Sequence, residues 1–227
     1  MIRDNDTAVG VVNYGLGNIG NVRRALLKLG IRHEAFSSPE SMAEFAPSLL
    51  LLIGVGAFRP AMERLVSSGW KDALTRWAQS GRPLLGICLG MQLLCANSTE
   101  YGTTEGLGLL EGDVRKLSGV KKIPHMGWNR AEPCGGEFEG NCFMAGGQNG
   151  SKGQDFYFVH SFAVRGSPHC AAKTEVDGVV FDSALRKENV AGCQFHPERS
   201  GPEGVSFLGR AISYMDGKYG RGRTSSC

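Results

Sequence analysis

One stretch of this chain restricts its possible folds more than any other. An apolar run of strand length leads into Gly86, Cys88 and Gly90 and continues at helical spacing to Leu94. Glycines two residues before and after a cysteine are typical of a nucleophile elbow, a sharp strand-to-helix turn that lifts one side chain above a sheet. Side chains at both glycine positions would collide with backbone in so tight a turn. The stretch predicts an α/β fold with Cys88 at a helix N-terminus, where the helix dipole favours the thiolate.

The segments before this turn indicate a parallel sheet. Apolar runs at 8–12, 31–36 and 49–53 are predicted strands, and helical patterns lie between them, one of them from Ser38 through Phe45. The five consecutive aliphatic residues of 49–53 suit a parallel strand that is covered on both faces. Strands that alternate with helices predict right-handed crossover units, and hence a mostly parallel central sheet flanked by helices.

The second half of the chain has a different texture. Glycines and short alternating apolar stretches over 100–190 predict an antiparallel extension with loops, including a surface excursion at 133–153. A last strand and a closing helix complete the pattern. Because no segment resembles a linker, we expect residues 1–227 to form one domain, with a structured core over about 8–215 and a flexible tail over 216–227.

Composition narrows the possible partners and compartment. The net charge is +3, and the basic residues are spread along the chain apart from a cluster at 218–223 that is typical of a frayed terminus, so we expect no nucleic-acid partner. No apolar run approaches the roughly 18 residues of a membrane span, and the N-terminus lacks the apolar core of a signal peptide. Seven cysteines without framework spacing favour a reducing compartment. The expected location is cytoplasmic, without membrane contact.

A glycine-rich loop near the N-terminus matches a nucleotide-binding fingerprint. Gly15, Gly17 and Gly20 follow the pattern Gly-x-Gly-x-x-Gly between a predicted strand and a predicted helix, and Glu34 stands where an acidic ribose ligand would be expected. The alternative is that the loop only turns the chain and that its amides serve another role. No second mononucleotide-binding half follows, which argues against a nicotinamide or flavin cofactor.

A motif more than a hundred residues after Cys88 supplies the groups that a cysteine nucleophile needs. His196 and Glu198 end the last predicted strand, and Pro197 between them restricts the backbone of this short segment. In this interpretation Cys88 attacks a carbonyl, and His196 takes the thiol proton and returns it to the leaving nitrogen. Glu198 orients the imidazole and stabilises its cationic form.

The same chemistry requires donors for an oxyanion. Gly54 and Val55 follow the strand next to the Cys88 strand, and their amides are candidates together with the amide of Leu89. Each of these features alone is compatible with core packing, and Cys88 alone could be a buried structural cysteine. Their occurrence together favours nucleophilic catalysis.

These motifs resemble those of the class I (triad) glutamine amidotransferases, which carry Gly-Ile-Cys-Leu-Gly-Met-Gln as at 86–92 and His-Pro-Glu as at 196–198. Within that family the chain looks like the glutaminase subunits of imidazole glycerol phosphate synthase. Five segments carry the likeness, which covers about residues 8–215: 13–18 (Asn-Tyr-Gly-Leu-Gly-Asn), 54–58 (Gly-Val-Gly-Ala-Phe), 124–129 (Pro-His-Met-Gly-Trp-Asn), 156–161 (Phe-Tyr-Phe-Val-His-Ser) and 196–200 (His-Pro-Glu-Arg-Ser).

The resemblance implies a flavodoxin-like fold and a glutaminase that hydrolyses L-glutamine to glutamate and ammonia, with no metal and no redox cofactor. It also implies a heterodimer with a cyclase subunit, a (β/α)8 barrel. That subunit would use the ammonia to make imidazole glycerol phosphate and an aminoimidazole carboxamide ribotide in histidine biosynthesis. Residues where the family binds glutamine are Gly56, Gln92, Glu100, Ser161 and Phe162. Residues where it faces the cyclase are Asn13, Asn18, Trp128, Asn129 and Arg199.

Three positions depart from the family pattern. Ile53 replaces a usual proline, Arg199 replaces a common lysine, and residues 176–178 replace a usual Tyr-Gly. Arg199 keeps the charge, but its planar group need not reproduce the contacts of a lysine. Two other functions stay open at this point. The same glutaminase chemistry could feed a nucleotide-sugar amidotransferase, and the glycine loop could belong to a non-catalytic nucleotide-binding module.

Overall fold

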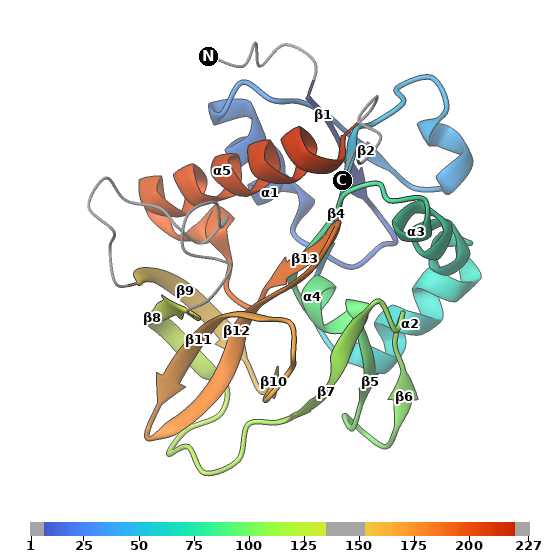
Figure 1. Ribbon diagram of the computed structural model, residues 1–227. Helices are drawn as coiled ribbons and strands as arrows, with labels where there is room; N and C mark the ends of the chain where they lie inside the picture. The colour runs from blue at the N-terminus through green and yellow to red at the C-terminus, as the bar shows by residue number, and fades with distance from the viewer. Residues whose placement is uncertain (1–6, 135–152, 221–227) are drawn as a thin grey trace.

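The computed structural model describes residues 7–134 and 153–220, which build a sheet with helices on both faces (Figure 1). Five strands in the order β2-β1-β3-β4-β13 run parallel to one another. This order is that of flavodoxin-like sheets, as the family resemblance implies. The bounds are β1 Ala8–Val12, β2 Arg32–Phe36, β3 Leu49–Gly54, β4 Leu84–Cys88 and β13 Val190–Cys193.

Two apolar cores lie on the two faces of this sheet. Because side chains alternate along a strand, Leu49, Leu51 and Ile53 of β3 enter one core and Leu50 and Leu52 enter the other. Burial on both faces explains the unbroken aliphatic run. The first core is covered by α1 (Ile19–Lys28) and α5 (Gly201–Tyr219), the second by α2 (Phe58–Ser67), α3 (Trp70–Gln79) and α4 (Leu89–Leu94).

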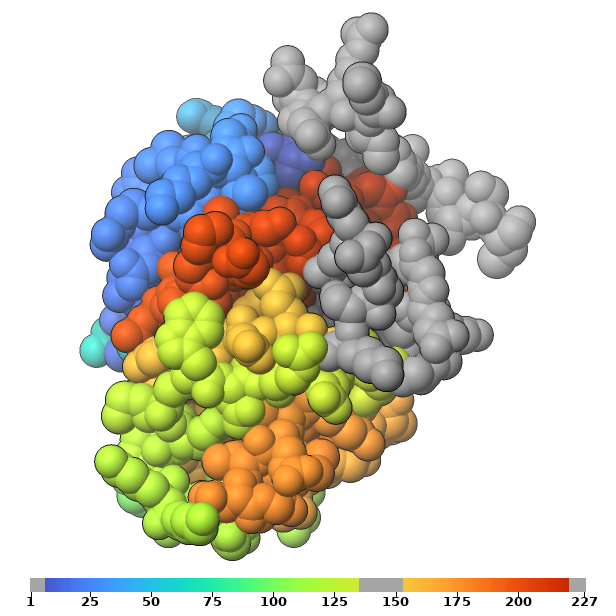
Figure 2. Space-filling model, turned by 90° about the vertical axis from the view of Figure 1, so that its left-hand side faces the viewer, coloured from blue at the N-terminus to red at the C-terminus, as the bar shows by residue number. Residues whose placement is uncertain are grey.

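An antiparallel region continues the sheet beyond β13. From β12 the sheet passes through β10, β7, β5 and β6, while β11 joins β12 to β8, and β8 pairs with β9. In the turned view of Figure 2, β8 and β9 (green and gold) lie directly against α5 (red). The bounds are β5 Cys95–Ser98, β6 Thr104–Glu105, β7 Leu110–Lys116, β8 His125–Pro133, β9 Gln154–His160, β10 Phe162–Val164, β11 Cys170–Val176 and β12 Val179–Lys187.

Several local predictions need correction. Only η1 (Pro39–Met42), a short 3-10 helix, forms where a helix through Phe45 is expected. Ala46 then adopts a φ of 47°, which interrupts a right-handed helix. Ala46 also precedes Pro47, and helical conformation is disfavoured for a residue that precedes a proline. Strand β7 lies in the region 100–190, where the sequence predicts antiparallel strands, but it pairs in parallel with β5. A short hairpin through β6 separates them and restores the original direction of the chain.

The chain ends differ in part from expectation as well. Helix α5 continues to Tyr219, so residues 216–219 are helical rather than part of a flexible tail. Most of the expected tail and most of the 133–153 excursion lie outside the described residues. Within 7–134 and 153–220, no helix combines the length and the apolar character needed to cross a membrane.

Candidate active site

The turn between β4 and α4 has the backbone of a nucleophile elbow. Cys88 adopts φ 54° and ψ −113°, a conformation that costs a non-glycine residue about 1–3 kcal/mol. A Cβ on Gly86 would lie 2.7 Å from the carbonyl carbon of Gly90, and one on Gly90 would overlap the carbonyl oxygen of Leu52. Both glycines are therefore required by close backbone contacts, as the sequence predicts, and Cys88 is the N-cap residue of helix α4.

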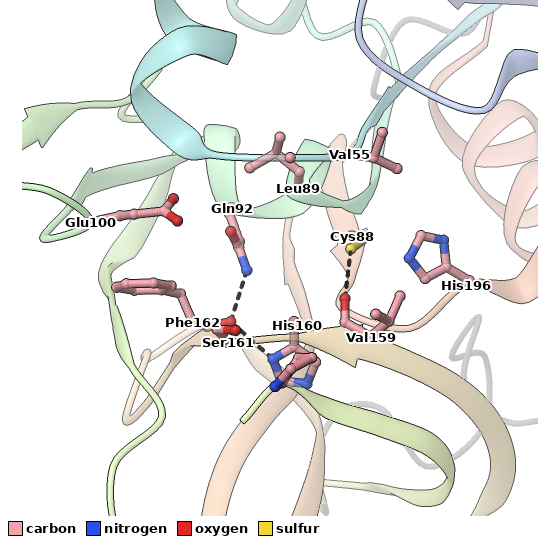
Figure 3. A pocket seen from close by; sticks show the side chains of 12 residues that line it. Val55, Cys88, Leu89, Gln92, Glu100, Val159, His160, Ser161, Phe162 and His196 are labelled. Carbon is pink, nitrogen blue, oxygen red and sulfur yellow. Dashed lines mark hydrogen bonds between the residues drawn. The ribbon is translucent and has the colours of Figure 1, made fainter. Parts of the chain in front are cut away.

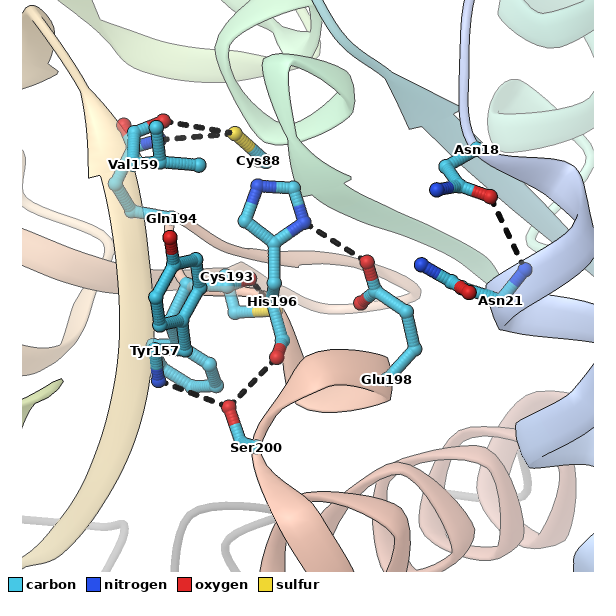
Figure 4. Close-up of polar contacts among 11 residues, drawn as sticks. Asn18, Asn21, Cys88, Tyr157, Val159, Cys193, Gln194, His196, Glu198 and Ser200 are labelled. Carbon is cyan, nitrogen blue, oxygen red and sulfur yellow. Dashed lines mark hydrogen bonds and ion pairs between the residues drawn. The ribbon is translucent and has the colours of Figure 1, made fainter. Parts of the chain in front are cut away.

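His196 and Glu198 meet directly beside this turn. His196 follows β13 and precedes η2 (Pro197–Arg199), and its Nδ1 donates to Glu198 Oε1 at 2.9 Å (Figure 4). Both side chains are buried. Nε2 of His196 makes no hydrogen bond to a described residue and is turned toward the Cys88 sulfur. Ser200 Oγ donates to the His196 carbonyl at 2.6 Å and fixes the backbone of this segment.

Charges around His196 favour its protonated form. Burial by itself lowers the pKa of the His196 imidazole, but the neighbouring Cys88 sulfur and the Glu198 carboxylate stabilise the imidazolium and raise the pKa to about 10. The thiolate is the nucleophilic form of a cysteine, and a neighbouring protonated histidine favours that form. The three side chains thus form a Cys-His-Glu arrangement in which each group has the partner that a catalytic triad requires.

A cavity of about 270 Å³ opens in front of Cys88 (Figure 3). This volume suits a small molecule such as a free amino acid better than a drug-sized ligand. The Cys88 Sγ lies 4.0 Å from the Val159 carbonyl oxygen on the opposite wall. Lining residues come from both halves of the sheet: Val55, Gly56, Cys88, Leu89, Gln92, Glu100, Pro124, Val159, His160, Ser161, Phe162 and His196.

All five residues predicted to bind glutamine lie on this cavity: Gly56, Gln92, Glu100, Ser161 and Phe162. The Gln92 side-chain amide donates to the Phe162 carbonyl at 2.9 Å, and also to Gln194 Oε1 at 2.9 Å. Glu100 Oε2 accepts from the backbone amide of Phe58 at 2.7 Å, which places its negative charge at the N-terminus of α2. The side chains of Gln92 and Glu100 are therefore both held in place by hydrogen bonds within the protein.

The three predicted oxyanion residues are not equivalent. Val55 and Leu89 line the cavity, whereas Gly54 lines a much smaller adjoining one. A Cβ on Gly54 would overlap the Tyr14 hydroxyl, so any other residue there would have to displace the Tyr14 side chain. The position of Val55 and Leu89 at the cavity makes their amides the better candidates for oxyanion donors.

The residues predicted to face a partner lie in several elements. Asn18 Oδ1 caps α1 by accepting from the Asn21 amide at 3.2 Å, and Asn13 Oδ1 accepts from Gly15 at 3.3 Å. Trp128 is 60% exposed on β8, and its neighbour Met126 is 57% exposed. Exposure of a tryptophan and a methionine on one strand is typical of interaction surfaces.

Two further predicted interface residues have partners inside the chain. Asn129 donates to the Glu175 carbonyl at 2.8 Å and lies 3.2 Å from His125 Nε2. The Arg199 guanidinium lies 4.3 Å above the Tyr157 ring, a cation–π contact that a planar group makes well.

The other two departures from the family pattern have simple structural settings. Ile53 is buried in β3 and lies beside Ile87 of β4. Asp177 and Gly178 form the tight turn between β11 and β12 with φ of 50° and 81°, as two-residue hairpins require.

Sequence reasoning assigned no role to three buried polar residues at this site. Gln194 Nε2 lies 3.7 Å from the Cys88 sulfur, and His125 and His160 hydrogen bond to each other at 3.0 Å. His125 and His160 occur within the segments 124–129 and 156–161 that carry the family resemblance, which was the available signal, and Gln194 lies two residues before His196. Their contacts depend on strand pairing between distant segments. Across the described ranges no cluster of three or more His, Cys, Asp or Glu side chains is arranged to hold a metal ion.

Comparison with known proteins agrees with this geometry. The model of the family "Glutamine amidotransferase class-I" matches residues 10–212. The imidazole glycerol phosphate synthase subunit HisH of Wolinella succinogenes is 42% identical over 212 residues, covering 88% of this chain and 96% of that protein. HisH of Geobacillus thermodenitrificans is 40% identical over 219 residues, covering 93% and 98%.

Solved structures show the same fold at lower sequence identity. A crystal structure of a glutamine amidotransferase has a TM-score of 0.70 at 20% identity and covers 92% of this chain and 98% of its own. The structure of PurLQS from Thermotoga maritima has a TM-score of 0.69 at 18% identity, with 92% and 99% covered.

Proposed function

Since the chain belongs to the class I glutamine amidotransferases and, within them, to the HisH subunits of imidazole glycerol phosphate synthase, we propose that it hydrolyses L-glutamine at Cys88. The protein is accordingly a glutaminase of histidine biosynthesis. The observation that carries the site assignment is the strained Cys88 turn beside the His196–Glu198 pair, on a cavity of amino-acid size.

The reaction begins with attack of the Cys88 thiolate on the side-chain carbonyl carbon of glutamine. A carbon–sulfur bond forms, and the negative charge moves to the carbonyl oxygen, where the amides of Val55 and Leu89 stabilise it. The His196 imidazolium gives its proton to the amide nitrogen, the carbon–nitrogen bond breaks, and ammonia leaves. The product on the enzyme is a γ-glutamyl thioester.

Water completes the cycle. Neutral His196 now takes a proton from a water molecule, and the resulting hydroxide attacks the thioester carbon. The carbon–sulfur bond breaks, glutamate leaves, and the Cys88 thiolate again faces an imidazolium. Glu198 holds Nδ1–H throughout and stabilises the cation on which both proton transfers depend.

Substrate recognition uses the polar groups that line the cavity. The Glu100 carboxylate is suited to the α-ammonium group of glutamine, since opposite charges attract strongly in a partly enclosed site. Gln92 and the Ser161–Phe162 backbone offer hydrogen-bonding groups to the rest of the substrate. A hydrocarbon analogue would leave these groups unpaired, which gives selectivity for a polar amino acid.

The protein works in a complex with a partner subunit, as its HisH relatives are subunits by name. We further propose that the partner is a (β/α)8-barrel cyclase that receives the ammonia. Its contact surface would include Asn13, Asn18, Trp128, Asn129 and Arg199. The exposed Trp128 and Met126 side chains support this assignment. The names of the relatives favour the histidine pathway over a nucleotide-sugar pathway as the destination of the ammonia.

The direct test is glutamine hydrolysis by purified Cys88→Ala in the presence of the cyclase partner. Loss of one cooperating triad member is expected to reduce the rate by at least about 10⁴-fold. Cys95→Ala is the matched control, because Cys95 is also a buried free cysteine but lies beyond α4 and does not line the cavity. Undiminished hydrolysis in a folded Cys88→Ala protein would refute the assignment.

A further inference from the structure

Two buried histidines that take no part in the proton transfers lie end to end between β8 and the cavity. His160 Nδ1 is 2.9 Å from the Phe162 carbonyl oxygen, and His160 Nε2 is 3.0 Å from His125 Nδ1. His125 Nε2 is in turn 3.2 Å from the Asn129 side-chain amide nitrogen. Three hydrogen bonds thus join the exposed strand β8 to the cavity wall.

The protonation of both rings follows from these contacts. Burial lowers the pKa of the His160 imidazole to about 3, and burial also lowers the pKa of His125. Both rings are therefore neutral at pH 7, with one donor and one acceptor nitrogen each. A carbonyl oxygen only accepts, so His160 carries its proton on Nδ1 and accepts at Nε2. His125 must then donate from Nδ1 and accept from Asn129 at Nε2.

The series of hydrogen bonds continues on the other side of the Phe162 carbonyl. This oxygen also accepts from Gln92 Nε2 at 2.9 Å, so both of its lone pairs are used. The second hydrogen of the same amide goes to Gln194 Oε1 at 2.9 Å, and Gln194 Nε2 lies 3.7 Å from the Cys88 sulfur. Both hydrogens of the Gln92 amide are thereby committed, and its oxygen is the group left for a ligand.

We propose that His125 and His160 are positioning residues that fix the Phe162 carbonyl and thereby the amide orientation of Gln92. The cavity then presents the Gln92 oxygen, an acceptor, to an N–H group of the substrate. This inference rests on the proposed glutaminase function and adds a determinant of glutamine affinity to it. The same series of hydrogen bonds links the cavity wall at Phe162 to Asn129, one of the residues assigned to the partner surface.

A purely structural role makes a different prediction. Both rings pack among aromatic side chains, with ring centroids 5.1 Å apart for His125 and Phe158 and 5.0 Å apart for His160 and Phe181. If shape alone mattered, a phenylalanine in place of His160 would preserve substrate binding. If the hydrogen bonds matter, the same substitution frees the Phe162 carbonyl and leaves His125 Nδ1–H without an acceptor.

The first experiment measures the tautomers directly, by nitrogen NMR of the histidine rings in the intact protein. We expect both His125 and His160 to be neutral and protonated at Nδ1 at pH 7 to 8. A proton on Nε2 of either ring, or an imidazolium at neutral pH, would overturn the proposal. This readout requires no activity, so it stands or falls separately from the glutaminase assignment.

The second experiment compares His160→Phe with His33→Phe in glutamine hydrolysis with the partner subunit. His33 is a matched control, because its Nδ1 also lies 2.8 Å from a carbonyl oxygen two residues away, on β2 and away from the cavity. We expect the KM for glutamine to rise about tenfold or more in His160→Phe, with a smaller change in kcat. Both constants should stay near wild type in the control.

Two outcomes of the kinetic comparison separate the proposals. An unchanged KM in a well-folded His160→Phe protein that still needs Cys88 would refute the positioning role and leave the glutaminase function intact. If His160→Phe does not fold, Asn129→Asp serves instead. A carboxylate beside His125 Nε2 can only accept, so each hydrogen bond from His125 to Phe162 would have to exchange its donor and acceptor. That variant should also raise KM and move the NMR proton of His125 to Nε2, and unchanged tautomers would contradict the account.

Discussion

The two walls of the cavity are held in place by different kinds of contact. On the wall that carries Cys88, strands β3 and β4 are buried aliphatic runs, and the turn into α4 is set by glycines that touch backbone. On the opposite wall, formed from β9, β10 and Pro124 ahead of β8, buried polar side chains hydrogen bond to one another and to carbonyl oxygens. Apolar packing thus fixes the nucleophile, and hydrogen bonds fix the substrate-binding groups.

This difference suits the two tasks. A nucleophile needs one position, and close packing supplies it because a packed core resists displacement. Substrate recognition needs donors and acceptors of defined direction, which only hydrogen-bonded groups supply. Substitutions in the wall that carries Cys88 are therefore expected to abolish folding or the whole reaction. Substitutions in the opposite wall should change the affinity for the substrate by a limited factor each.

The largest effect is expected at Gly90. A Cβ there would overlap the Leu52 carbonyl oxygen, so Gly90→Ala must displace β3 or α4. We expect a loss of at least about 4 kcal/mol in the free energy of unfolding, measured by urea denaturation. The control is Gly217→Ala in α5, where an added Cβ meets no atom within 4 Å. It should be neutral or stabilising by up to about 1 kcal/mol, and equal losses in both variants would remove the steric argument.

The next effect concerns Glu198, which touches His196 without contacting the cavity. Glu198→Gln removes a charge that raises the pKa of His196, so we expect this pKa to fall below its value of about 10. The alkaline limb of the kcat/KM profile should move to lower pH, because the imidazolium is lost earlier. The rate should drop about 10³–10⁴-fold. Glu203→Gln, an exposed carboxylate in the first turn of α5, should change neither quantity.

A smaller effect is expected at Ile53, which replaces the proline usual in this family. Proline has no backbone N–H and a fixed φ, so it restricts the Gly54–Val55 peptide that follows. We predict that Ile53→Pro lowers partner-free glutamine hydrolysis more than partner-stimulated hydrolysis. Ile53 is also buried in β3, so thermal stability must be measured beside both rates. An unchanged basal rate in a stable variant would rule out control of the oxyanion donors by this residue.

We predict that the Gly15–Gly20 loop binds no nicotinamide or flavin dinucleotide. Asn18 in this loop caps α1 and lines a small cavity together with His196 and Glu198, and no second nucleotide-binding half accompanies the loop. Titration calorimetry with nicotinamide and flavin dinucleotides should detect no heat of binding. Micromolar affinity for any of them would reopen the nucleotide-binding alternative.

The features that the sequence predicts well are those set within short segments. The Gly86–Gly90 turn is local, because its glycines are demanded by contacts within the turn and with the adjacent strand. His196 and Glu198 are two residues apart, so their hydrogen bond depends on little besides Pro197. The alternation of strands and helices up to α4 follows from the same local periodicity.

The features that sequence reasoning missed depend on pairing between distant strands. His125 and His160 meet because β8 and β9 pair in a register that sets these residues opposite each other. Gln194 reaches both Gln92 and Cys88 only through the placement of β13 beside β4. Such registers depend on the whole sheet, and the motifs contain no signal for them. The parallel pairing of β5 with β7 escaped prediction for the same reason.

The central claim is that Cys88 alone attacks the substrate, and covalent labelling tests it most directly. A glutamine analogue with a diazoketone in place of the amide can enter the cavity and alkylate a reactive thiolate. With the partner subunit present, we predict one adduct per chain, found on the Cys88 peptide by mass spectrometry and absent from Cys88→Ala. The buried thiols Cys95 and Cys193 should stay unmodified, since burial raises the pKa of both. An adduct on any other residue, or none while glutamine hydrolysis continues, would contradict the account.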